Sequence, residues 1–330
     1  MPFGITMGDA SGVGPEILLR AYHANLLAND VFAYGDAAIL AAGAKLLELD
    51  ISLNVIQQPS ELIPGTLNVL DLDCLTSDDL TPGKVNRKAG AAARNYVLRA
   101  TADALAGKIR AIVTLPMNKE ATRLSDPTFC GHTELIADAC DTDNFTLMLA
   151  TPEVVCTHVS THVSMEESIA RCKTDRVLNV ITLTHDTLQR FIPNPRIAVC
   201  GLNAHAGENG LFGMQDLEEI KPAVAQARIN GIDAEGPLPG DTTFYLAVHQ
   251  DRYDGIVCQY HDQGHAPMKL LAFESGVNVT AGLPIIRTSV DHGTAFDIAW
   301  QGKAFTDGLT HAIDYARKPV SYTHLRAHET

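Results

Sequence analysis

The stretch that decides the fold is YDGIVCQYHDQGHAPMKLLAFESGVNVTAGLPIIRTSVDHGTA, residues 253–295. Its first part, Gly255–Cys258, is a short apolar run between polar residues, and such a run predicts a buried β-strand. The polar cluster Tyr260–His265 follows directly and supplies hydrogen-bond donors, acceptors and potential metal ligands. Because Gly264 and Pro267 fall in or beside this cluster, we predict a turn here rather than the start of a helix.

The second half of the same stretch repeats this arrangement. An apolar run, 277–283, leads to Arg287 and then to the polar group Asp291–Thr294. Open α/β sheets bind their ligands just beyond the carboxyl ends of buried strands, which is where both polar groups fall. Loop residues that only satisfy one another would also be polar, but two such groups within about 40 residues favour a functional site.

Apolar runs of strand length alternate with segments of helix length along the chain. The expected strands are 3–7, 31–34, 68–72, 111–115, 145–149, 154–157, 196–202, 255–258 and 277–283. The expected helices are 15–22, an alanine-rich one after Asp36, 88–106, 165–190 and 217–229, with a loop at 236–242. This alternation predicts an α/β fold with a mostly parallel sheet covered on both faces.

Composition limits the possible partners and compartment. The chain has 330 residues and a formal net charge of −14 at pH 7, which argues against nucleic acid or an anionic membrane as the main partner. No apolar run is long enough to span a bilayer, and the first residues do not resemble a signal peptide. The seven cysteines form no C-x-x-C pair, which indicates free thiols in a reducing compartment, so we expect a cytoplasmic protein.

Three histidines share one sequence context, an apolar strand followed by a histidine just past its end. They are His162, His205 and His261. The carboxyl ends of parallel strands gather at one edge of a sheet, so these imidazoles could meet and hold a divalent metal with one position open. His158 is an alternative to His162, and His265 is an alternative to His261.

Cations and a helix start indicate an anionic substrate. Lys269 and Arg287 are the cations nearest the two polar groups, and arginine is the better phosphate ligand. His132 and Thr133 stand at the expected head of a helix, where backbone N–H groups favour anions, although an ordinary helix cap would look the same. The loop Gly8–Glu16 is a further candidate for a cofactor or anion, but its glycine spacing is not that of a dinucleotide fingerprint.

Several motifs, in order along residues 3–318, resemble the 4-hydroxythreonine-4-phosphate dehydrogenase family of vitamin B6 (pyridoxine) synthesis. The motifs are MGDASGVGPE, GHTE, GLNAHAGENG, YHDQGHAPMK and GVNVTAGLPIIRTSVDHGTA. The resemblance implies an isocitrate/isopropylmalate dehydrogenase-like fold of two α/β/α lobes with a cleft between them. We expect a cofactor-side lobe of 1–125 plus 279–318 and a metal and dimer-interface lobe of 126–278. The polar end, 319–330, is expected to be a tail without function.

The resemblance also implies an activity and its parts. The family oxidises a 4-phosphorylated hydroxy acid with NAD or NADP, and a metal-assisted β-decarboxylation follows. It implies a homodimer with shared active sites and one divalent metal per site (Zn, Mg, Co or Mn). The implied metal ligands are His162, His205 and His261. The implied substrate contacts are His132, Thr133, Lys269, Asn278 and Arg287. The implied cofactor segment is Asp291, His292, Gly293, Thr294 and Ala295. Lys269 and Asp241 are the candidates for moving protons, and position alone does not rank them.

The sequence departs from the family at two positions. His265 stands where the biosynthetic enzymes usually have leucine, which resembles the branch acting on D-threonate or D-erythronate 4-phosphate and also the dihydrodiol dehydrogenases of terephthalate breakdown. Asn278 and Arg287 favour a phosphorylated substrate over a diol. Trp300 replaces an expected glycine near the cofactor segment.

Two other classes of function fit the same residues. A metal-dependent lyase or aldolase could use the three histidines without a nicotinamide, and a non-catalytic protein could simply bind an anion. Formation of reduced nicotinamide in the presence of substrate separates the dehydrogenase from both.

Overall fold

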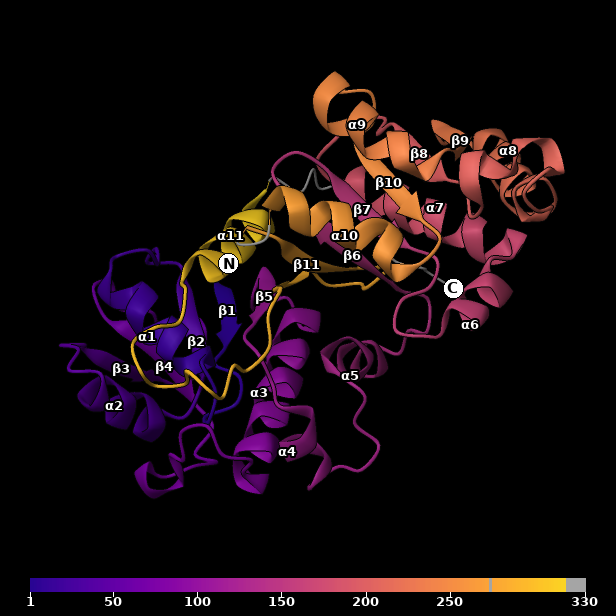
Figure 1. Ribbon diagram of the computed structural model, residues 1–330. Coiled ribbons are helices and arrows are strands. Elements are labelled where there is room, and N and C mark those ends of the chain that lie inside the picture. The colour runs from indigo at the N-terminus through magenta and orange to yellow at the C-terminus, as the bar shows by residue number, and fades with distance from the viewer. Residues whose placement is uncertain (273–274, 319–330) are drawn as a thin grey trace, which may run out of the picture. The chain divides into compact units, whose positions relative to one another are not determined.

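The computed structural model describes residues 1–272 and 275–318 (Figure 1), so the predicted tail 319–330 lies outside the described residues. The chain divides into two compact units, which we call unit 1 and unit 2. Among the described residues, unit 1 comprises 1–145 and 275–316, and unit 2 comprises 146–272 and 317–318. No helix in the described part is both long and apolar enough to cross a membrane.

Unit 1 is a mostly parallel sheet with helices packed on it. Its strands are β1 (Phe3–Thr6), β2 (Val31–Gly35), β3 (Leu53–Ile56), β4 (Leu67–Asp71), β5 (Ala111–Thr114), β11 (Val277–Ala281) and β12 (Arg287–Val290). Its helices are α1 (Gly14–His23), α2 (Ala37–Leu46), η1 (Ser77–Asp79), α3 (Arg87–Leu105), α4 (Lys119–Arg123), α5 (His132–Ala139) and α11 (Asp307–Arg317). The strand order is β3-β4-β2-β1-β5-β12-β11, and β11 runs antiparallel to β12.

Unit 2 has the same layered plan. Its strands are β6 (Thr146–Ala150), β7 (Val155–His158), β8 (Ile197–Cys200), β9 (Ala234–Leu238) and β10 (Gly255–Cys258). Its helices are α6 (Met165–Arg171), α7 (Thr174–Leu188), η2 (Ala204–Gly210), η3 (Asp216–Ile220), α8 (Lys221–Ile229), α9 (Gly240–Gln250) and α10 (His261–Ala272). The order is β6-β7-β10-β8-β9, with β6 antiparallel to β7 and the other neighbours parallel.

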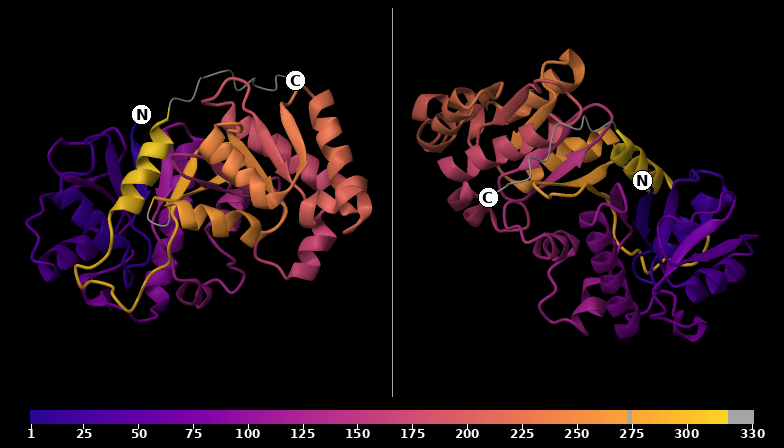
Figure 2. Two further views of the ribbon diagram at one scale, coloured as in Figure 1. Left: turned by 45° about the horizontal axis from the view of Figure 1, so that its top comes forward. Right: turned by 180° about the vertical axis from the view of Figure 1, so that it is seen from behind.

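Both faces of the unit 2 sheet are covered, because alternate residues of a strand point to opposite sides. Val199 and Val257 belong to a buried cluster shared with α7 and α8. Cys200 and Cys258 belong to the cluster on the other face, shared with α9 and α10. Figure 2 shows these helices on either side of the strands. The predicted α/β class is therefore confirmed.

The turn predicted at 260–265 is wrong, because α10 begins at His261 and continues through Pro267. Gly264 serves close packing instead of a turn. A Cβ at Gly264 would lie 2.4 Å from His158 Nε2, so glycine allows α10 to approach β7. The proline cannot donate a helical hydrogen bond and its ring crowds the carbonyl four residues earlier, so packing of α10 in unit 2 must offset this cost.

The single helix predicted at 165–190 is also wrong, because α6 and α7 are separated at Cys172 and Lys173. Glu219 accepts hydrogen bonds from the backbone N–H and the hydroxyl of Thr174, each at 2.9 Å. This carboxylate satisfies the start of α7 from 45 residues away along the chain. Helical periodicity contains no information about such a distant cap.

Other boundaries follow the sequence more closely. The helix predicted at 88–106 is confirmed as α3, where the Asn86 side chain accepts hydrogen bonds from two backbone N–H groups of the first turn. Gly107 follows its end with a φ of +66°. The loop predicted at 236–242 is wrong in extent, since only Pro239 separates β9 from α9.

Trp300 fixes the segment after β12 onto unit 1. Its backbone has a φ of 62°, and its side chain is only 5% exposed. The indole N–H donates to the carbonyl of Ala10 at 2.8 Å. A Cβ on Gly43 of α2 would lie 2.1 Å from a ring atom of Trp300, so glycine at this position makes room for the indole.

We expect Gly43→Ala to destabilise the protein by about 1–3 kcal/mol, the usual cost of overpacking a filled core. Without a clash, alanine in a helix stabilises by about 0.5–1 kcal/mol relative to glycine. The sign of the change in the free energy of unfolding therefore shows whether the clash with Trp300 dominates. Urea unfolding of the variant measures it. Ala41→Gly, at an exposed position of the same helix, is the matched control and should lose only the propensity term. A more stable Gly43→Ala protein would contradict the packing assigned to Trp300.

Candidate functional site

A polar stripe lies on one face of the unit 1 sheet around Arg287. Strand pairing places Thr6 beside Thr114 and Thr114 beside Ser289, so these side chains share a face with Arg287, two residues before Ser289. Asn278 is paired with Ser289 across β11 and β12 and lies on that face too. Thr6 Oγ1 and Asn278 Oδ1 have no hydrogen-bond partner among the described residues, so this face has polar atoms that a ligand can bind.

Arg287 is a buried cation held by neutral groups. It is 4% exposed, and its guanidinium donates to the hydroxyls of Thr114 at 2.8 Å and Thr280 at 3.2 Å. Its Nε has no hydrogen-bond partner among the described residues. Burial lowers the pKa of the guanidinium to about 10, and the nearby Glu134 carboxylate opposes that shift. A buried cation with an unused donor suits an anionic ligand.

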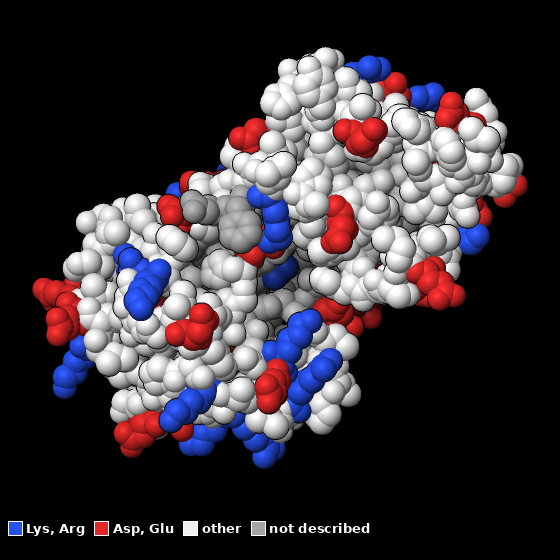
Figure 3. Space-filling model, viewed as in Figure 1, with Lys and Arg blue, Asp and Glu red and all other residues white. Residues whose placement is uncertain are grey.

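The attraction for an anion is local. On the face of the described residues drawn in Figure 3, Lys and Arg side chains are interspersed with Asp and Glu and form no continuous basic surface. The whole chain carries a net charge of −14. Individual buried cations such as Arg287 must therefore supply the attraction.

His132 begins α5, which confirms the predicted helix start at His132 and Thr133. Burial, followed by the charge of Arg287, lowers the pKa of His132 to about 3, so its imidazole is neutral at pH 7. The ring is hydrogen-bonded to the backbone of Leu115, and its Nε2 is buried without a partner in the described part of the chain. A neutral ring bonded in this way offers a lone pair at Nε2 that can accept a hydrogen bond from a ligand hydroxyl.

The predicted cofactor segment, 291–295, is joined to a predicted substrate residue. The Asn278 side-chain amide donates to Asp291 Oδ1 at 2.8 Å. The segment is also bonded to the loop that follows β1, because the Val13 N–H donates to the Thr294 carbonyl at 3.0 Å. The loop after β1, a candidate ligand loop in the sequence analysis, therefore packs against the predicted cofactor segment.

Asp9 is a buried carboxyl group in the same loop. Its Oδ1 accepts the Ser11 N–H at 2.8 Å, and its Oδ2 has no partner among the residues described. Burial raises the pKa of Asp9 to about 6. The sequence analysis did not single out this residue, because only the folded structure shows that it is buried.

We expect Asp9 to make the folded protein less stable as pH rises. Its folded pKa of about 6 is above the ordinary value of 3.8, so its stabilising contribution is complete below about pH 4 and lost as pH passes 6. The difference corresponds to about 3 kcal/mol. Asp9→Asn keeps the acceptor for Ser11, so the variant should gain stability over the wild type by up to this amount between pH 4 and pH 8. Parallel stability curves of the two proteins in urea would contradict this role.

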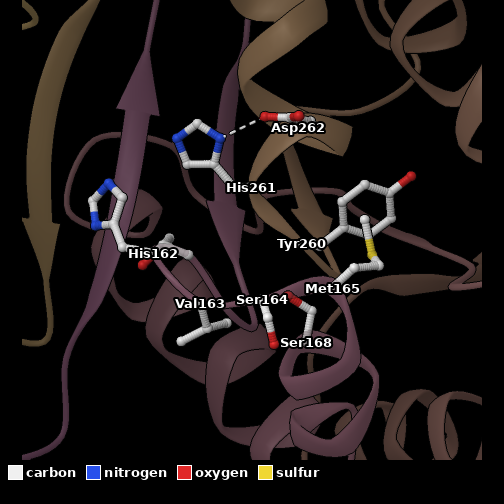
Figure 4. Close-up of a pocket in the computed structure, with 9 residues that line it drawn as sticks. His162, Val163, Ser164, Met165, Ser168, Tyr260, His261 and Asp262 are labelled. Carbon is white, nitrogen blue, oxygen red and sulfur yellow. Dashed lines mark hydrogen bonds and ion pairs between the residues drawn. The ribbon is translucent and has the colours of Figure 1, made fainter.

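The carboxyl ends of the parallel strands of unit 2 carry the histidine candidates. His162 follows β7, His261 begins α10 after β10, and the centres of the two rings lie 5.5 Å apart. Figure 4 shows both rings on one side of a hollow of ≈ 550 Å³, with Tyr260 and Met165 on the other side. The predicted proximity of these two histidines is therefore visible within one unit.

His261 has the partner that a metal-binding imidazole needs. Its Nδ1 lies 2.7 Å from Asp262 Oδ1, the contact drawn as a dashed line in Figure 4. A carboxylate accepts hydrogen bonds, so Nδ1 carries the proton and Nε2 keeps its lone pair. Two imidazoles on one tetrahedral ion have ring centres about 5 Å apart, which the pair His162–His261 matches. The pair fits a divalent cation.

His205 does not complete this pair. No group of three or more His, Cys, Asp or Glu side chains is placed to hold a metal ion within residues 1–272 and 275–318. His205 lies in a left-handed run, 205–209, with φ values of 41–76°. Buried Asp216 supports the start of this run by accepting hydrogen bonds from the backbone N–H groups of Leu202 and Asn203. Left-handed backbone costs about 1–2 kcal/mol per non-glycine residue, and strain of this kind collects at functional sites.

The two candidates for proton movement lie on neighbouring helices. Asp241 is exposed in the first turn of α9, and Lys269 is partly buried on α10. Gln263 of α10 is bonded to the residues that follow β8 and β10. Its amide N–H donates to the Gly201 carbonyl at 2.8 Å, and its amide oxygen accepts the Gln259 N–H at 2.7 Å. A Cβ on the first residue of α9 would lie 2.9 Å from Gln263 Nε2. The sequence analysis missed Gln263, although it lies in a motif that we singled out.

The structure separates the alternative histidines from the first choices. His158 is 1% exposed and His265 is 7% exposed. His162 and His261 instead line the hollow. The two sets therefore form a buried inner pair and an accessible outer pair.

Comparison with known proteins identifies the family. Residues 27–316 match the family model described as pyridoxal phosphate biosynthetic protein PdxA. The chain is 46% identical over 316 residues to a D-threonate 4-phosphate dehydrogenase of Cupriavidus necator, with 94% of each chain covered. It is 41% identical over 332 residues to a 4-hydroxythreonine-4-phosphate dehydrogenase of Desulforapulum autotrophicum, covering 97% of this chain and 96% of the relative.

Solved structures agree with the sequence relatives. A 4-hydroxythreonine-4-phosphate dehydrogenase from Klebsiella pneumoniae matches with a TM-score of 0.89 and 42% identity, over 96% of this chain and 98% of that one. A terephthalate 1,2-cis-dihydrodiol dehydrogenase from Burkholderia xenovorans matches with a TM-score of 0.69 and 28% identity, over 96% and 97% of the two chains.

The fold, the site and these relatives define an oxidoreductase that acts on a CH–OH group. More narrowly, the chain belongs to the PdxA family. The predicted family resemblance and the predicted α/β family fold are confirmed.

Proposed function

We propose that the protein oxidises a 4-phosphorylated hydroxy acid with NAD or NADP, and that the resulting β-keto acid loses carbon dioxide. The observation that carries this proposal is Arg287, a buried guanidinium with an unused donor in a family whose named members act on phosphorylated hydroxy acids. A phosphate offers several acceptor oxygens to the forked donors of arginine. The proposal places the phosphate there, beside His132 and the start of α5.

The residues around Arg287 orient the rest of the substrate. Neutral His132 accepts a hydrogen bond from a substrate hydroxyl at Nε2, which holds that hydroxyl in one rotamer. Thr133 adds a donor, and Asn278 adds an acceptor, because its buried Oδ1 lacks a partner among the described residues. Lys269 or Asp241 takes the hydroxyl proton and later protonates the carbon that has lost carbon dioxide.

The same proposal includes one divalent metal, Zn, Mg, Co or Mn. His162 and His261 would hold it, with His205 as the third ligand, and it would supply Lewis acidity to the hydroxyl and to the carbonyl formed from it. Asp262 maintains the His261 lone pair at Nε2. Binding of a divalent cation by the isolated protein is the direct measurement.

The nicotinamide cofactor is assigned to unit 1. Its proposed contacts are Asp291, His292, Gly293, Thr294 and Ala295. Asn278, a proposed substrate contact, donates a hydrogen bond to Asp291, a proposed cofactor contact, which supports adjacent binding sites for substrate and cofactor. A nicotinamide bound there would supply the acceptor for the hydride that leaves the substrate carbon. This proposal keeps 1–125 with 279–318 as the cofactor-side lobe and 126–278 as the metal and dimer-interface lobe.

We further propose a homodimer with shared active sites, in the cytoplasm. The family resemblance supports the dimer, and the separation of His205 from the outer pair is consistent with a ligand supplied by a second subunit. The cytoplasm is supported by free cysteines, four of which are buried: Cys156, Cys172, Cys200 and Cys258. Small phosphorylated acids are the partners that this arrangement favours.

D-threonate 4-phosphate is the first substrate to test, and 4-hydroxy-L-threonine 4-phosphate is the second, because relatives of both names match at 46% and 41% identity. Each is incubated with NAD and with NADP, alongside D-erythronate 4-phosphate, and reduced nicotinamide and carbon dioxide are followed. D-threonate 4-phosphate should give dihydroxyacetone phosphate. Product without reduced nicotinamide would indicate a lyase, and tight binding without product would indicate an anion-binding protein.

A further inference from the structure

A chain of three imidazoles runs from the interior of unit 2 to the hollow. His265 Nδ1 lies 3.1 Å from His158 Nε2. The His265 ring is stacked on the His261 ring, with 3.8 Å between their centres and 8° between their planes. His261 and His265 are one turn apart on α10, so the helix itself sets this stacking.

Two backbone carbonyls fix the direction of the hydrogen bonds. His158 Nδ1 faces the Leu147 carbonyl at 3.5 Å, and His265 Nδ1 faces the His261 carbonyl at 3.3 Å. Carbonyl oxygens only accept, so each Nδ1 carries a hydrogen. His158 Nε2 is then the acceptor for His265 Nδ1–H. In this arrangement Nδ1 carries a hydrogen in both inner histidines.

The local packing is built around this contact. Gly264 lies one residue before His265, and a Cβ there would come within 2.4 Å of His158 Nε2. Any other residue at position 264 would push α10 away from β7 and break the imidazole contact. Burial of His158 and His265 at 1% and 7% exposure keeps water from competing for these bonds.

We propose that His265, held in place by His158, is a positioning residue that fixes the ring orientation of His261. The edge of the His261 ring contacts the neighbouring Asp262, whose side chain is 82% exposed and therefore holds the ring weakly. The flat contact with His265 stops rotation of the ring out of the plane that presents Nε2 to His162. Metal-binding sites are tuned by residues that touch the ligands, which here includes a stacked ring besides the usual carboxylate.

The expected effect of His265 on metal affinity rests on the proposed metal role of His261. The arrangement of the three rings does not depend on that role. The geometric part is tested in the metal-free protein by long-range nitrogen–proton NMR of selectively labelled histidines. Nδ1 should carry the proton in both His158 and His265, and His158 Nε2 should carry none. An Nε2–H tautomer at His265 would overturn the proposal, whatever the activity of the protein.

The functional part is tested by titration with Co²⁺, followed by its visible absorption, and with Zn²⁺ by calorimetry. His265→Ala should bind both ions about 10–100-fold more weakly, the usual effect of removing a group that orients a ligand. His265→Phe keeps the stacked ring but loses the hydrogen bond to His158, so it should recover only part of that affinity. Wild-type affinity and an unchanged Co²⁺ spectrum in His265→Ala would overturn the positioning role.

Two further variants keep the test valid if His265→Ala is poorly folded. His158→Gln keeps an acceptor for His265 Nδ1–H and should bind metal more tightly than His158→Leu, which does not. His249→Ala removes an exposed imidazole from α9 and is the matched control. Circular dichroism confirms folding of each protein. Equal metal affinity of His158→Gln and His158→Leu would count against the proposal, whereas a wild type that binds no metal would instead refute the proposed function.

Discussion

Arg287→Met should lower kcat/KM for the phosphorylated substrate by about 10²–10³-fold while leaving the stability of the free protein within about 1 kcal/mol of the wild type. The loss of activity follows from two or more charge-assisted hydrogen bonds to the phosphate, each contributing about 1.5–3 kcal/mol. The unchanged stability follows from the bonding of Arg287 in the free protein. It is buried and donates only to neutral hydroxyls, and burial already lowers its pKa.

A large loss of kcat/KM together with unchanged stability distinguishes a ligand-binding arginine from a structural one. Removing a buried arginine that is paired with a carboxylate typically destabilises a protein by about 3–5 kcal/mol, because the carboxylate is left buried without a partner. Arg87→Met, at an exposed position of the same unit, is the control and should change neither quantity. The unphosphorylated hydroxy acid provides a second control, because its poor turnover should be insensitive to Arg287. An unchanged KM for the phosphorylated substrate would remove Arg287 from the phosphate site.

The sequence could predict elements whose signals are local. The strand at 255–258 and helix α3 depend on apolar runs, an N-cap asparagine and a terminal glycine, all read within a few residues. The start of α10 could not be read in that way. Gly264 suggested a turn, yet the reason for it is the position of His158, which comes from a strand about a hundred residues earlier. The break before Thr174 depends on a distant carboxylate in the same way.

The candidate site shows the same division between chemistry and geometry. Residue types indicated that Arg287 would meet an anion, but its burial and its partners Thr114 and Thr280 come only from strand register. Paired histidines four residues apart, at 158 and 162 and again at 261 and 265, were visible in the sequence as alternatives. Only the fold shows that one member of each pair is buried while the other lines the hollow.

His205→Ala and His261→Ala should each lose most bound metal and at least about 10³-fold in turnover, the scale of losing one preorganised electrostatic group, while remaining folded. We also expect the two inactive proteins to restore activity when their subunits are mixed. His162 and His261 are neighbours in one chain, whereas His205 is not grouped with them among the described residues. A partner subunit that supplies His205 would therefore complete the site.

The arithmetic of mixing makes this expectation sharp. Random exchange of His205→Ala and His261→Ala subunits makes half of the dimers mixed, and each mixed dimer has one intact site, so about a quarter of the wild-type activity should return. Mixing His162→Ala with His261→Ala should restore nothing, because that pair must come from one chain. If all three ligands belong to the same chain, no mixture regains activity. If activity returns when His261→Ala is mixed with His205→Ala but not with His162→Ala, the strained loop 205–209 presents an imidazole to a neighbouring subunit.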